Sequence, residues 1–311
     1  MRKVNEIWNT NFLGRYVTAA RKKELRVAVH SGIFHADDVY CVALLDLAFD
    51  LAMNRTPNFN VGVNFEMSNF TTTRTRDERL LDASDILLDV GYEYDCIRVF
   101  DHHQKNVPKN VLDDIPHSAF GLLAEVVLLD SRVLDEFRKT TVISIEARDN
   151  GLPAPEGYGI SGEWVACFNP NWDESADAHA RFIEAAYVAK RLLYLQLNRI
   201  VSSINAEALV DEAVKSGEDT NILVLDKFVP WKSHVFRHYP DILAAVFLGH
   251  SGWTVSGALL KGEDDMTQKF YFPEGFEAEG MTFLHKARFM AVFDSKEHAI
   301  AAAKKAIEAN Q

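Results

Sequence analysis

Short apolar runs that end in histidine or aspartate are the feature that most constrains the fold of this 311-residue chain. Three of these runs, each with the polar residues that follow it, are 26–29 with His30, 86–88 with Asp89, and 97–100 with Asp101, His102 and His103. Runs of this length and composition are typical of strands in a buried parallel sheet. Because the carboxyl ends of parallel strands lie at one edge of the sheet, the sequence predicts that these polar residues form one site.

The residue types at these strand ends suit a metal site. Imidazole nitrogen and carboxylate oxygen together favour Mn²⁺, Fe²⁺, Co²⁺ or Zn²⁺, whereas an all-oxygen set would favour Mg²⁺ or Ca²⁺. His35 and Asp37 follow His30 in the same segment, so there are more candidate ligands than one tetrahedral ion can take. A carboxylate such as Asp89 can bridge two ions. We therefore predict a two-metal site, with Mn²⁺ as the first choice and Mg²⁺, Co²⁺ or Zn²⁺ as alternatives.

Each of these residues also has an ordinary structural interpretation. A single histidine after a strand, such as His30, is more often a capping or core residue than a ligand. Adjacent histidines after an aspartate are seldom needed for packing, since a buried polar group without a partner costs about 1–3 kcal/mol, and this favours metal binding by His102. Asp38 could equally be a first-turn acid that the helix dipole stabilises, and Asp149 could equally belong to a plain C-cap turn.

Composition limits the classes of protein and substrate. A length of 311 residues allows about two domains, and 48% hydrophobic residues are ample for two buried cores. The formal net charge of −12 argues against a general nucleic-acid coat, because phosphate neutralisation needs clustered lysine and arginine. The acidic balance favours short or small phosphorylated substrates over long polymers.

The cysteines and the hydropathy pattern bear on location. Cys41, Cys96 and Cys167 are odd in number and include no C-x-x-C pair, which argues against a disulfide framework or a zinc knuckle and favours a reducing compartment. No apolar run has the length of a membrane span, so we expect no membrane association. A cytoplasmic location is the simplest expectation, with an organelle signal in the basic residues 1–26 as the alternative to a short docked helix.

The apolar pattern predicts two α/β domains joined by a long helix. Residues 36–51 are apolar nearly all round and predict a buried helix whose amino terminus faces the site. Further predicted elements are strands at 61–67, 222–225, 243–248 and 254–260, and helices at 118–129, at 134–148 and after Ser295. From residue 175 to Gly217, apolar residues at spacings of three and four predict one amphipathic helix. We place a metal-binding catalytic domain at residues 1–195 and a smaller substrate-binding domain at 196–311.

Longer motifs surround the candidate ligands. They are HSGIFHADD at 30–38, RTRD at 74–77, DVG at 89–91, DHHQ at 101–104, DNG at 149–151, NPNWD at 169–173, PWK at 230–232 and FLHKARFM at 283–290. In order and spacing these motifs resemble those of the melanocyte-proliferating-gene exonuclease family, a branch of the DHH phosphoesterases. The resemblance runs from about Arg26 to the carboxyl terminus.

The resemblance implies a two-domain α/β protein with a parallel-sheet DHH-type phosphoesterase domain and an active site between the domains. The metal ligands that it implies are His30, His35, Asp37, Asp89, His102 and Asp149. It also implies that His103 contacts the substrate phosphate and that Asp101 orients a neighbouring imidazole.

Substrate contacts are predicted in both domains. The candidate phosphate contacts are Arg74, Arg76, His285 and Arg288, and the arginines offer the bidentate fork that phosphate prefers. A single arginine is more often a solvated surface charge. Trp172 and Trp231 could stack a nucleobase, although core packing is the commoner role of tryptophan.

The expected function is a Mn²⁺-dependent 3′→5′ exoribonuclease or short-oligonucleotide hydrolase in which two ions promote in-line attack of water on phosphorus. The expected partner is short RNA or another phosphodiester, and the oligomeric state is open, with a homodimer as one option. The alternatives are a phosphatase or pyrophosphatase for a small phosphorylated metabolite, and a non-catalytic binding protein on the same fold. The intact set of ligands argues against the last.

Overall fold

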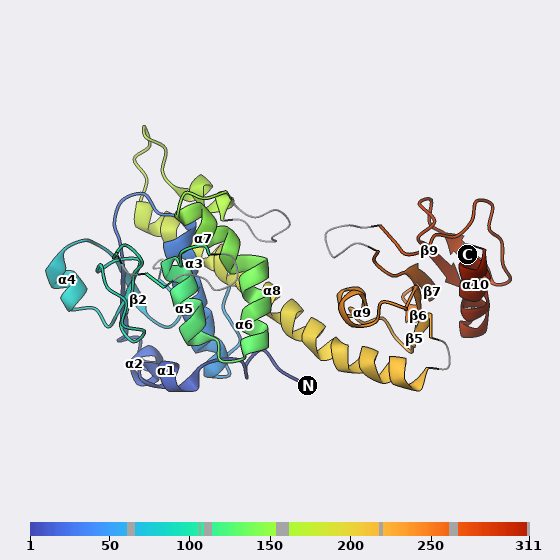
Figure 1. Ribbon diagram of the computed structural model, residues 1–311. Coiled ribbons are helices and arrows are strands. Elements are labelled where there is room, and N and C mark those ends of the chain that lie inside the picture. The colour runs from blue at the N-terminus through green and yellow to red at the C-terminus, as the bar shows by residue number, and fades with distance from the viewer. Residues whose placement is uncertain are drawn as a thin grey trace. The chain divides into compact units, whose positions relative to one another are not determined.

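The chain divides into two compact units, unit 1 (Met1–Val201) and unit 2 (Ser202–Gln311). A computed structural model describes residues 1–60, 66–105, 107–108, 114–153, 162–217, 220–260 and 267–309. Figure 1 shows the elements of unit 1 in blue, green and yellow and the sheet of unit 2 in orange and red. The division falls within helix α8 (Ala178–Ser216), as does the domain boundary expected after residue 195. The long helix predicted from the sequence is therefore confirmed.

Unit 1 is built on a parallel sheet with strand order β2-β1-β3-β4. Its strands are β1 (Arg26–Val29), β2 (Thr71–Arg74), β3 (Ile86–Leu88) and β4 (Val99–Phe100). Every residue of β3 and β4 is buried, and so are the last three of β1, which explains why these strands appear in the sequence as apolar runs. The predicted α/β class with a buried parallel sheet is confirmed.

Helix α3 (Ala36–Ala52) is the central helix of unit 1 and is buried from Ala36 to Leu51, as its apolar sequence predicts. The other helices of this unit are α1 (Thr10–Gly14), α2 (Val17–Lys22), α4 (Glu78–Asp82), α5 (Ala119–Val127), α6 (Ser131–Phe137), a π-helix η1 (Arg138–Val142), α7 (Ile143–Asp149) and a 3₁₀-helix η2 (Glu163–Phe168). α3 packs against α1, α5, α7, β3 and η2. The helix predicted at 134–148 thus consists of consecutive helical segments, in which the π-helix η1 lies between α6 and α7.

The second strand of unit 1 lies at a different place from the one predicted. Residues 61–65 of the predicted strand at 61–67 lie outside the described residues, and residues 66 and 67 are not in a strand. The strand that pairs with β1 is β2, whose sequence is Thr-Thr-Thr-Arg. β2 lies at the edge of the sheet and is only partly buried, so it has no apolar run. In the sequence, only the β-branched threonines indicate that this segment is a strand.

Unit 2 is a smaller α/β unit with a mixed sheet of strand order β5-β6-β7-β9-β8. Its elements after α8 are β5 (Ile222–Leu225), α9 (Lys232–His238), β6 (Ala244–Gly249), β7 (Gly252–Gly257), β8 (Met281–Leu284), β9 (Met290–Phe293) and α10 (Lys296–Glu308). β5 and β6 are parallel, and the remaining pairs are antiparallel. Ser295 caps α10 by accepting a hydrogen bond from the His298 backbone N–H, as predicted. Across the described residues, no helix combines the length and the apolar character needed to cross a membrane.

Candidate metal centre

The register of the parallel sheet brings the polar strand ends together. Val29 of β1 pairs with Leu88 of β3, and Leu88 pairs with Phe100 of β4. The residue after each of these is therefore at the same edge of the sheet and at the same level. These residues are His30, Asp89 and Asp101, in three adjacent strands.

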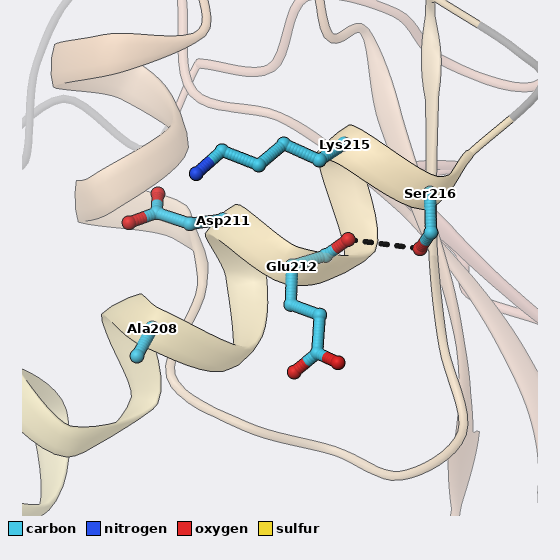
Figure 2. Close-up of a pocket in the computed structure, with 5 residues that line it drawn as sticks. All are labelled: Ala208, Asp211, Glu212, Lys215 and Ser216. Carbon is cyan, nitrogen blue, oxygen red and sulfur yellow. Dashed lines mark hydrogen bonds between the residues drawn. The ribbon is translucent and has the colours of Figure 1, made fainter.

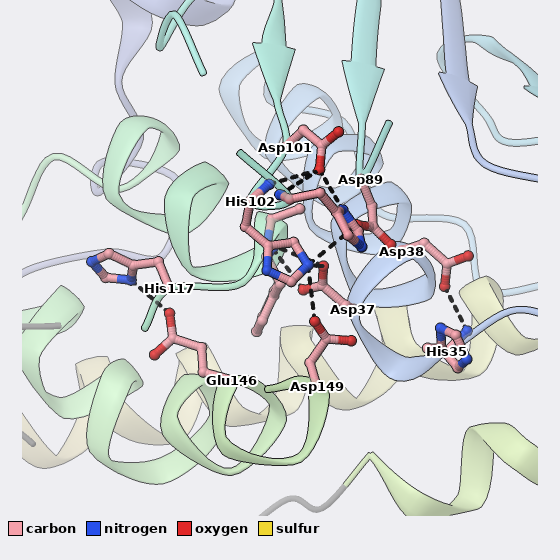
Figure 3. A network of polar contacts seen from close by, with 12 residues as sticks. His35, Asp37, Asp38, Asp89, Asp101, His102, His117, Glu146 and Asp149 are labelled. Carbon is pink, nitrogen blue, oxygen red and sulfur yellow. Dashed lines mark hydrogen bonds and ion pairs between the residues drawn. The ribbon is translucent and has the colours of Figure 1, made fainter. Parts of the chain in front are cut away.

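Three overlapping groups of possible metal ligands lie at this edge (Figure 3). They are Asp89 with His102 and His103, His30 with Asp38 and Asp89, and Asp37 with His102 and Asp149, and the ligand atoms of each group lie within 4.8 Å of one another. Asp89 belongs to two of the groups, and so does His102. The three groups thus form one continuous centre.

Asp37 lies in the first turn of α3 and is completely buried. Its two carboxylate oxygens accept hydrogen bonds from the backbone N–H groups of Ala119, at 3.0 Å, and Phe120, at 2.8 Å. These donors belong to the first turn of α5, where the helix dipole favours a negative charge. Burial nevertheless raises the pKa of Asp37 well above its usual range, and the nearby carboxylates of Asp149 and Asp89 add to the rise.

Asp38 is also completely buried, and it belongs to the centre as well as to the first turn of α3. One carboxylate oxygen accepts the backbone N–H of His35 at 3.0 Å, which fits a first-turn acid. The other lies 3.1 Å from Nε2 of His30. Burial raises the pKa of Asp38. Asp38 is therefore both a first-turn acid, as the sequence allowed, and a neighbour of His30. The second contact could not be read from the sequence, because it depends on the tertiary structure.

Asp89 has a backbone conformation that non-glycine residues seldom adopt. Its φ angle is +53°, in the left-handed region, which costs an ordinary residue roughly 1–2 kcal/mol. Its backbone N–H donates to the carbonyl of Phe100 at 2.9 Å, so the conformation is fixed by the neighbouring strand. Residues held in this way are concentrated at functional sites. In Figure 3 the Asp89 side chain points away from the strand ends, on the side of Asp38.

His102 lies between two parts of the centre. Its Nε2 atom is 2.9 Å from Asp149 Oδ2 and 3.4 Å from Asp89 Oδ1. Asp149 is the last residue of α7, so it is both the end of a helix and a member of a ligand group.

Asp101 orients the second histidine of the pair. Its Oδ1 atom is 2.7 Å from Nδ1 of His103 and also accepts the backbone N–H groups of His102 and His103. Its other oxygen accepts the backbone N–H of Tyr92 at 2.6 Å. The side chain of His103 is 52% exposed and its Nδ1 atom lies 3.5 Å from Asp89. The orienting role that the motif resemblance implies for Asp101 stays a prediction, and the hydrogen bonds to His103 are the contacts through which it would act.

The imidazoles of the centre are held in their charged form by the carboxylates. Burial opposes a charge on His30, but Asp38 and Asp89 outweigh it and raise its pKa to about 10. Burial likewise opposes a charge on His102, and Asp149 and Asp89 raise its pKa to about 11. Burial would raise the pKa of Asp89, but the two imidazoles lower it to about 2. The carboxylates of the centre thus favour positive charge on the groups that lie between them.

Unsatisfied atoms show that the centre fits metal ions. Among the residues that the structure describes, three buried atoms at the centre make no hydrogen bond of good geometry: Asp38 Oδ2, Asp89 Oδ1 and His102 Nε2. An unpaired polar atom in a buried position costs about 1–3 kcal/mol, so such atoms are rare without a function. A divalent cation bound to these carboxylate and imidazole atoms would remove this cost.

A second polar network supports the spacing of the ligands (Figure 3). His117, before α5, contacts Glu146 of α7 through Nδ1 at 2.6 Å. Asn150 donates to the carbonyl of Pro116 at 3.0 Å, which ties the end of α7 to the same segment. A Cβ atom at Gly121 would overlap the Glu146 carboxylate, so glycine is required there. This network was not predicted from the sequence, where its signal is a glycine inside an apolar helix.

Three residues of unit 1 that were predicted as a ligand or as phosphate contacts lie outside the three ligand groups: His35, Arg74 and Arg76. The side chain of His35 is exposed, and its ring centroid lies 5.8 Å from that of His30. The Arg74 guanidinium donates to the carbonyls of Gly32 and Ala178, so these donors bind backbone. Arg76 is exposed. The predicted roles of these residues as ligand and phosphate contacts stay predictions.

The other two predicted phosphate contacts lie in unit 2, between β8 and β9. Nδ1 of His285 accepts the backbone N–H of Ala287 at 3.1 Å, and its ring stacks near Phe289 with centroids 4.3 Å apart. Arg288 is exposed and has a left-handed φ of +59°. Their contact with a substrate stays a prediction.

A shallow pocket of about 480 Å³ lies along the last turns of α8 (Figure 2). Its lining residues are Ala208, Asp211, Glu212, Lys215 and Ser216. Asp211 is already engaged by His234, at 2.6 Å, and by the Tyr239 hydroxyl, at 2.7 Å. Within the described ranges, no group of three metal ligands falls in this pocket. The strand-end centre is therefore the stronger candidate for the functional site.

Comparison with known proteins gives the family. A family model named MYG1_exonuc, with the description "Uncharacterised protein family (UPF0160)", matches residues 26–307. The MYG1 protein of Schizosaccharomyces pombe is 26% identical over 337 residues, which cover 91% of this chain and 98% of that protein. The MYG1 exonuclease of Mus musculus is 28% identical over 250 residues, which cover 68% of this chain and 61% of that protein.

Among solved structures, RecJ from Thermus thermophilus in complex with Mg²⁺ aligns with a TM-score of 0.30 and 12% identity, over 96% of this chain and 51% of that one. A likeness this low fixes neither fold nor function, so the assignment depends on the family match, which covers nearly the whole chain. The resemblance seen in the sequence motifs is confirmed. The chain belongs to the MYG1 exonuclease family.

Proposed function

We propose that this protein is a two-metal phosphodiesterase that removes nucleotides from the 3′ end of RNA or hydrolyses short oligonucleotides. The observation that carries this proposal is the orientation of Asp89. Its Oδ2 atom lies 3.3 Å from Nε2 of His30, and its Oδ1 atom lies 3.4 Å from Nε2 of His102. The two oxygens therefore face different ligand groups, as expected of a carboxylate that bridges two ions.

Asp89 shares one group with His30 and Asp38 and another with His102 and His103, and His102 shares the third group with Asp37 and Asp149. This set differs from the one implied by the motif resemblance, since it adds Asp38 to the ligands. His35 remains a proposed additional ligand.

Divalent ions bound at these groups would supply the charge that activates water and stabilises negative charge around phosphorus. The protein's own residues would place the substrate. His103 is half exposed and is bonded to Asp101 through Nδ1, so its Nε2 edge is available to a phosphate oxygen. The Asp101 hydrogen bond also raises the pKa of His103, which favours the charged imidazole that binds phosphate best.

The choice of metal and substrate follows from the ligands and the family. Mixed imidazole and carboxylate ligands favour Mn²⁺, with Co²⁺, Zn²⁺ and Mg²⁺ as alternatives. Relatives named exonuclease support a nucleic-acid substrate. The net charge of −12 supports a short one, because long polymers need extended basic surfaces.

The test is a comparison of substrates at equal concentration. Purified protein with Mn²⁺ is incubated with 5′-labelled RNA, DNA of the same sequence, dinucleotides, pyrophosphate and a phosphomonoester. We expect RNA to shorten stepwise from its 3′ end and a 3′-blocked RNA to resist. Asp89→Asn should be inactive, whereas Asp82→Asn, which removes an exposed carboxylate of the same unit, should behave as wild type. Hydrolysis of pyrophosphate or the monoester alone would replace this proposal by the phosphatase alternative.

A further inference from the structure

Trp172 is the feature of unit 1 that the proposed chemistry leaves unexplained. The sequence favoured core packing for this residue, and that expectation is wrong, because its side chain is 97% exposed. Trp231, for which the same role was favoured, is 2% exposed and does pack in the core of unit 2. A tryptophan offers more apolar surface than any other residue, so full exposure forgoes a large gain from burial.

The turn that carries Trp172 is well built. The backbone N–H of Glu174 donates to the carbonyl of Asn171 at 3.0 Å, which closes a β-turn with Trp172 at its second position. The Glu174 carboxylate accepts the backbone N–H of Asn171 at 3.3 Å and pairs with Arg181 of α8. Trp172 is therefore held outward by a defined turn.

The same segment is tied at both of its ends to the loop between His30 and His35. The side chain of Asn169 accepts from the Phe34 backbone N–H at 3.0 Å and donates to the Phe34 carbonyl at 2.8 Å. At the other end, the Arg74 guanidinium donates to the carbonyls of Ala178 and Gly32. Phe34 and Gly32 lie in the loop that begins with the candidate ligand His30. Because three residues span at most about 11 Å, the Cα atom of Trp172 lies within about that distance of Asn169, which contacts the loop.

A second exposed apolar side chain lies in the loop that Asn169 and Arg74 contact. Ile33, in the loop between His30 and His35, is 70% exposed. Single exposed apolar residues are ordinary, but here two of them lie on segments that hydrogen bonds join to each other, and one of these segments begins with the candidate ligand His30. The charges of this segment are largely paired, since Glu174 forms an ion pair with Arg181 and Asp177 accepts the backbone N–H groups of His179 and Ala180. The two exposed apolar side chains therefore suit an uncharged flat group.

We propose that Trp172, with Ile33, is a base-stacking subsite that binds the nucleobase of the nucleotide whose phosphate lies at the metal centre. This inference rests on the proposed phosphodiesterase function and narrows its substrate class to nucleotides with an unpaired base. Stacking on an aromatic ring contributes about 1–3 kcal/mol per base and tolerates every base, so little sequence preference is expected. Pyrophosphate and base-free phosphodiesters would gain nothing from it.

The decisive experiment compares a trinucleotide with its abasic analogue in the wild type, Trp172→Ala, Trp172→Phe and Ile33→Ala. Trp172→Ala should raise KM for the trinucleotide by roughly 5- to 150-fold, the equivalent of a lost stack, with a smaller change in kcat. Trp172→Phe keeps a ring and should restore most of the affinity. Leu129→Ala, which removes an exposed apolar side chain on the connection between α5 and α6, is the matched control and should have no effect. On the abasic analogue all variants should equal the wild type.

Binding is measured separately, so that failure of the stacking subsite and failure of the proposed function can be told apart. Anisotropy of a fluorescent trinucleotide in the Asp89→Asn background should show weaker binding when Trp172 is also changed to alanine. Lost binding with no hydrolysis of any phosphodiester by the wild type would keep the subsite and overturn the function. Equal KM and equal binding with and without the indole, or an equal loss on the abasic analogue, would overturn the subsite and leave Trp172 for a protein partner.

Discussion

Helix α3 carries two pairs of buried carboxylates whose partners differ. Asp37 and Asp38 lie in its first turn, and Asp46 and Asp50 lie in its second half. None of the four is more than 3% exposed. Burial alone would disfavour a charge on all of them to a similar degree.

The pair in the second half has its counter-charge within the protein. Nζ of Lys190, itself fully buried, lies 2.5 Å from Asp46 and 2.6 Å from Asp50. The Asn69 side chain donates to both carboxylates at 2.9 Å. Burial lowers the pKa of Lys190, but the two carboxylates outweigh it and raise the pKa, so the lysine stays charged.

The pair in the first turn lacks such a partner. In the part of the chain that the structure describes, no lysine or arginine forms an ion pair with Asp37 or Asp38. The Arg74 guanidinium interacts with Asp38 only at longer range, and the groups in direct contact with the two carboxylates are imidazoles and backbone N–H groups. One oxygen of Asp38 makes no hydrogen bond. Buried carboxylates that are neutralised by a lysine of the same protein thus have a structural role. Buried carboxylates without such a partner indicate a site for an external cation.

The largest expected effect is that of Asp89→Asn on hydrolysis. Loss of the carboxylate that faces both ligand groups should lower kcat/KM at least about a thousandfold, which is about 4 kcal/mol of transition-state stabilisation. The fold should be unchanged by circular dichroism, and elemental analysis should find fewer Mn²⁺ ions per chain. Full activity with undiminished metal would show that Asp89 is not a bridge.

Lys190→Met should have a large effect on stability. Removal of the lysine leaves two buried carboxylates without their cation, and the expected loss in the free energy of unfolding is about 3–5 kcal/mol, measured by urea denaturation. A triple variant in which Asp46 and Asp50 are also changed to asparagine should recover most of it. If the single variant were as stable as the wild type while Mn²⁺ affinity fell, the two clusters would not be separate in role.

His102→Ala and His103→Ala should separate a ligand from a substrate contact. Because Nε2 of His102 faces two carboxylates of the centre, its loss should weaken Mn²⁺ binding by about 10–100-fold in titration calorimetry. His103 is half exposed and bonded to Asp101, so its loss should lower the rate more than the metal affinity. Equal losses of affinity would make both residues ligands.

The smallest expected effect tests a histidine that resembles His30 but is fully paired. His117 contacts Glu125 and Glu146; burial opposes its charge, but these carboxylates raise its pKa to about 9. A raised folded-state pKa gives stability that is complete below about pH 6.5 and is lost as the pH rises to about 9. The difference in unfolding free energy between wild type and His117→Gln should therefore shrink by about 1–2 kcal/mol over this window. A difference that does not change with pH would mean that His117 is neutral.

The sequence by itself determined that α3 is buried and where three of the four strands of unit 1 end, although it misplaced β2. The runs at 26–29 and 86–88 are apolar because both faces of the sheet are covered, so their pattern survives in the sequence without any knowledge of the fold. The same holds for α3, which is buried on all sides. Because parallel strands end at one edge of the sheet, it was predictable that His30, Asp89 and Asp101 lie close together. The motifs that indicate the family are also present in the sequence itself.

Only the tertiary structure decided the partners of each polar residue. Lys190 and Asp46 are 144 positions apart, Asn169 and Phe34 are 135 apart, and Arg74 and Ala178 are 104 apart. No local pattern records such pairings, because a side chain's periodicity shows which face it occupies but not which segment covers that face. The sequence could therefore show that α3 carries buried acids. Which pair meets a lysine and which is left for a metal ion depends on how distant segments pack against the helix.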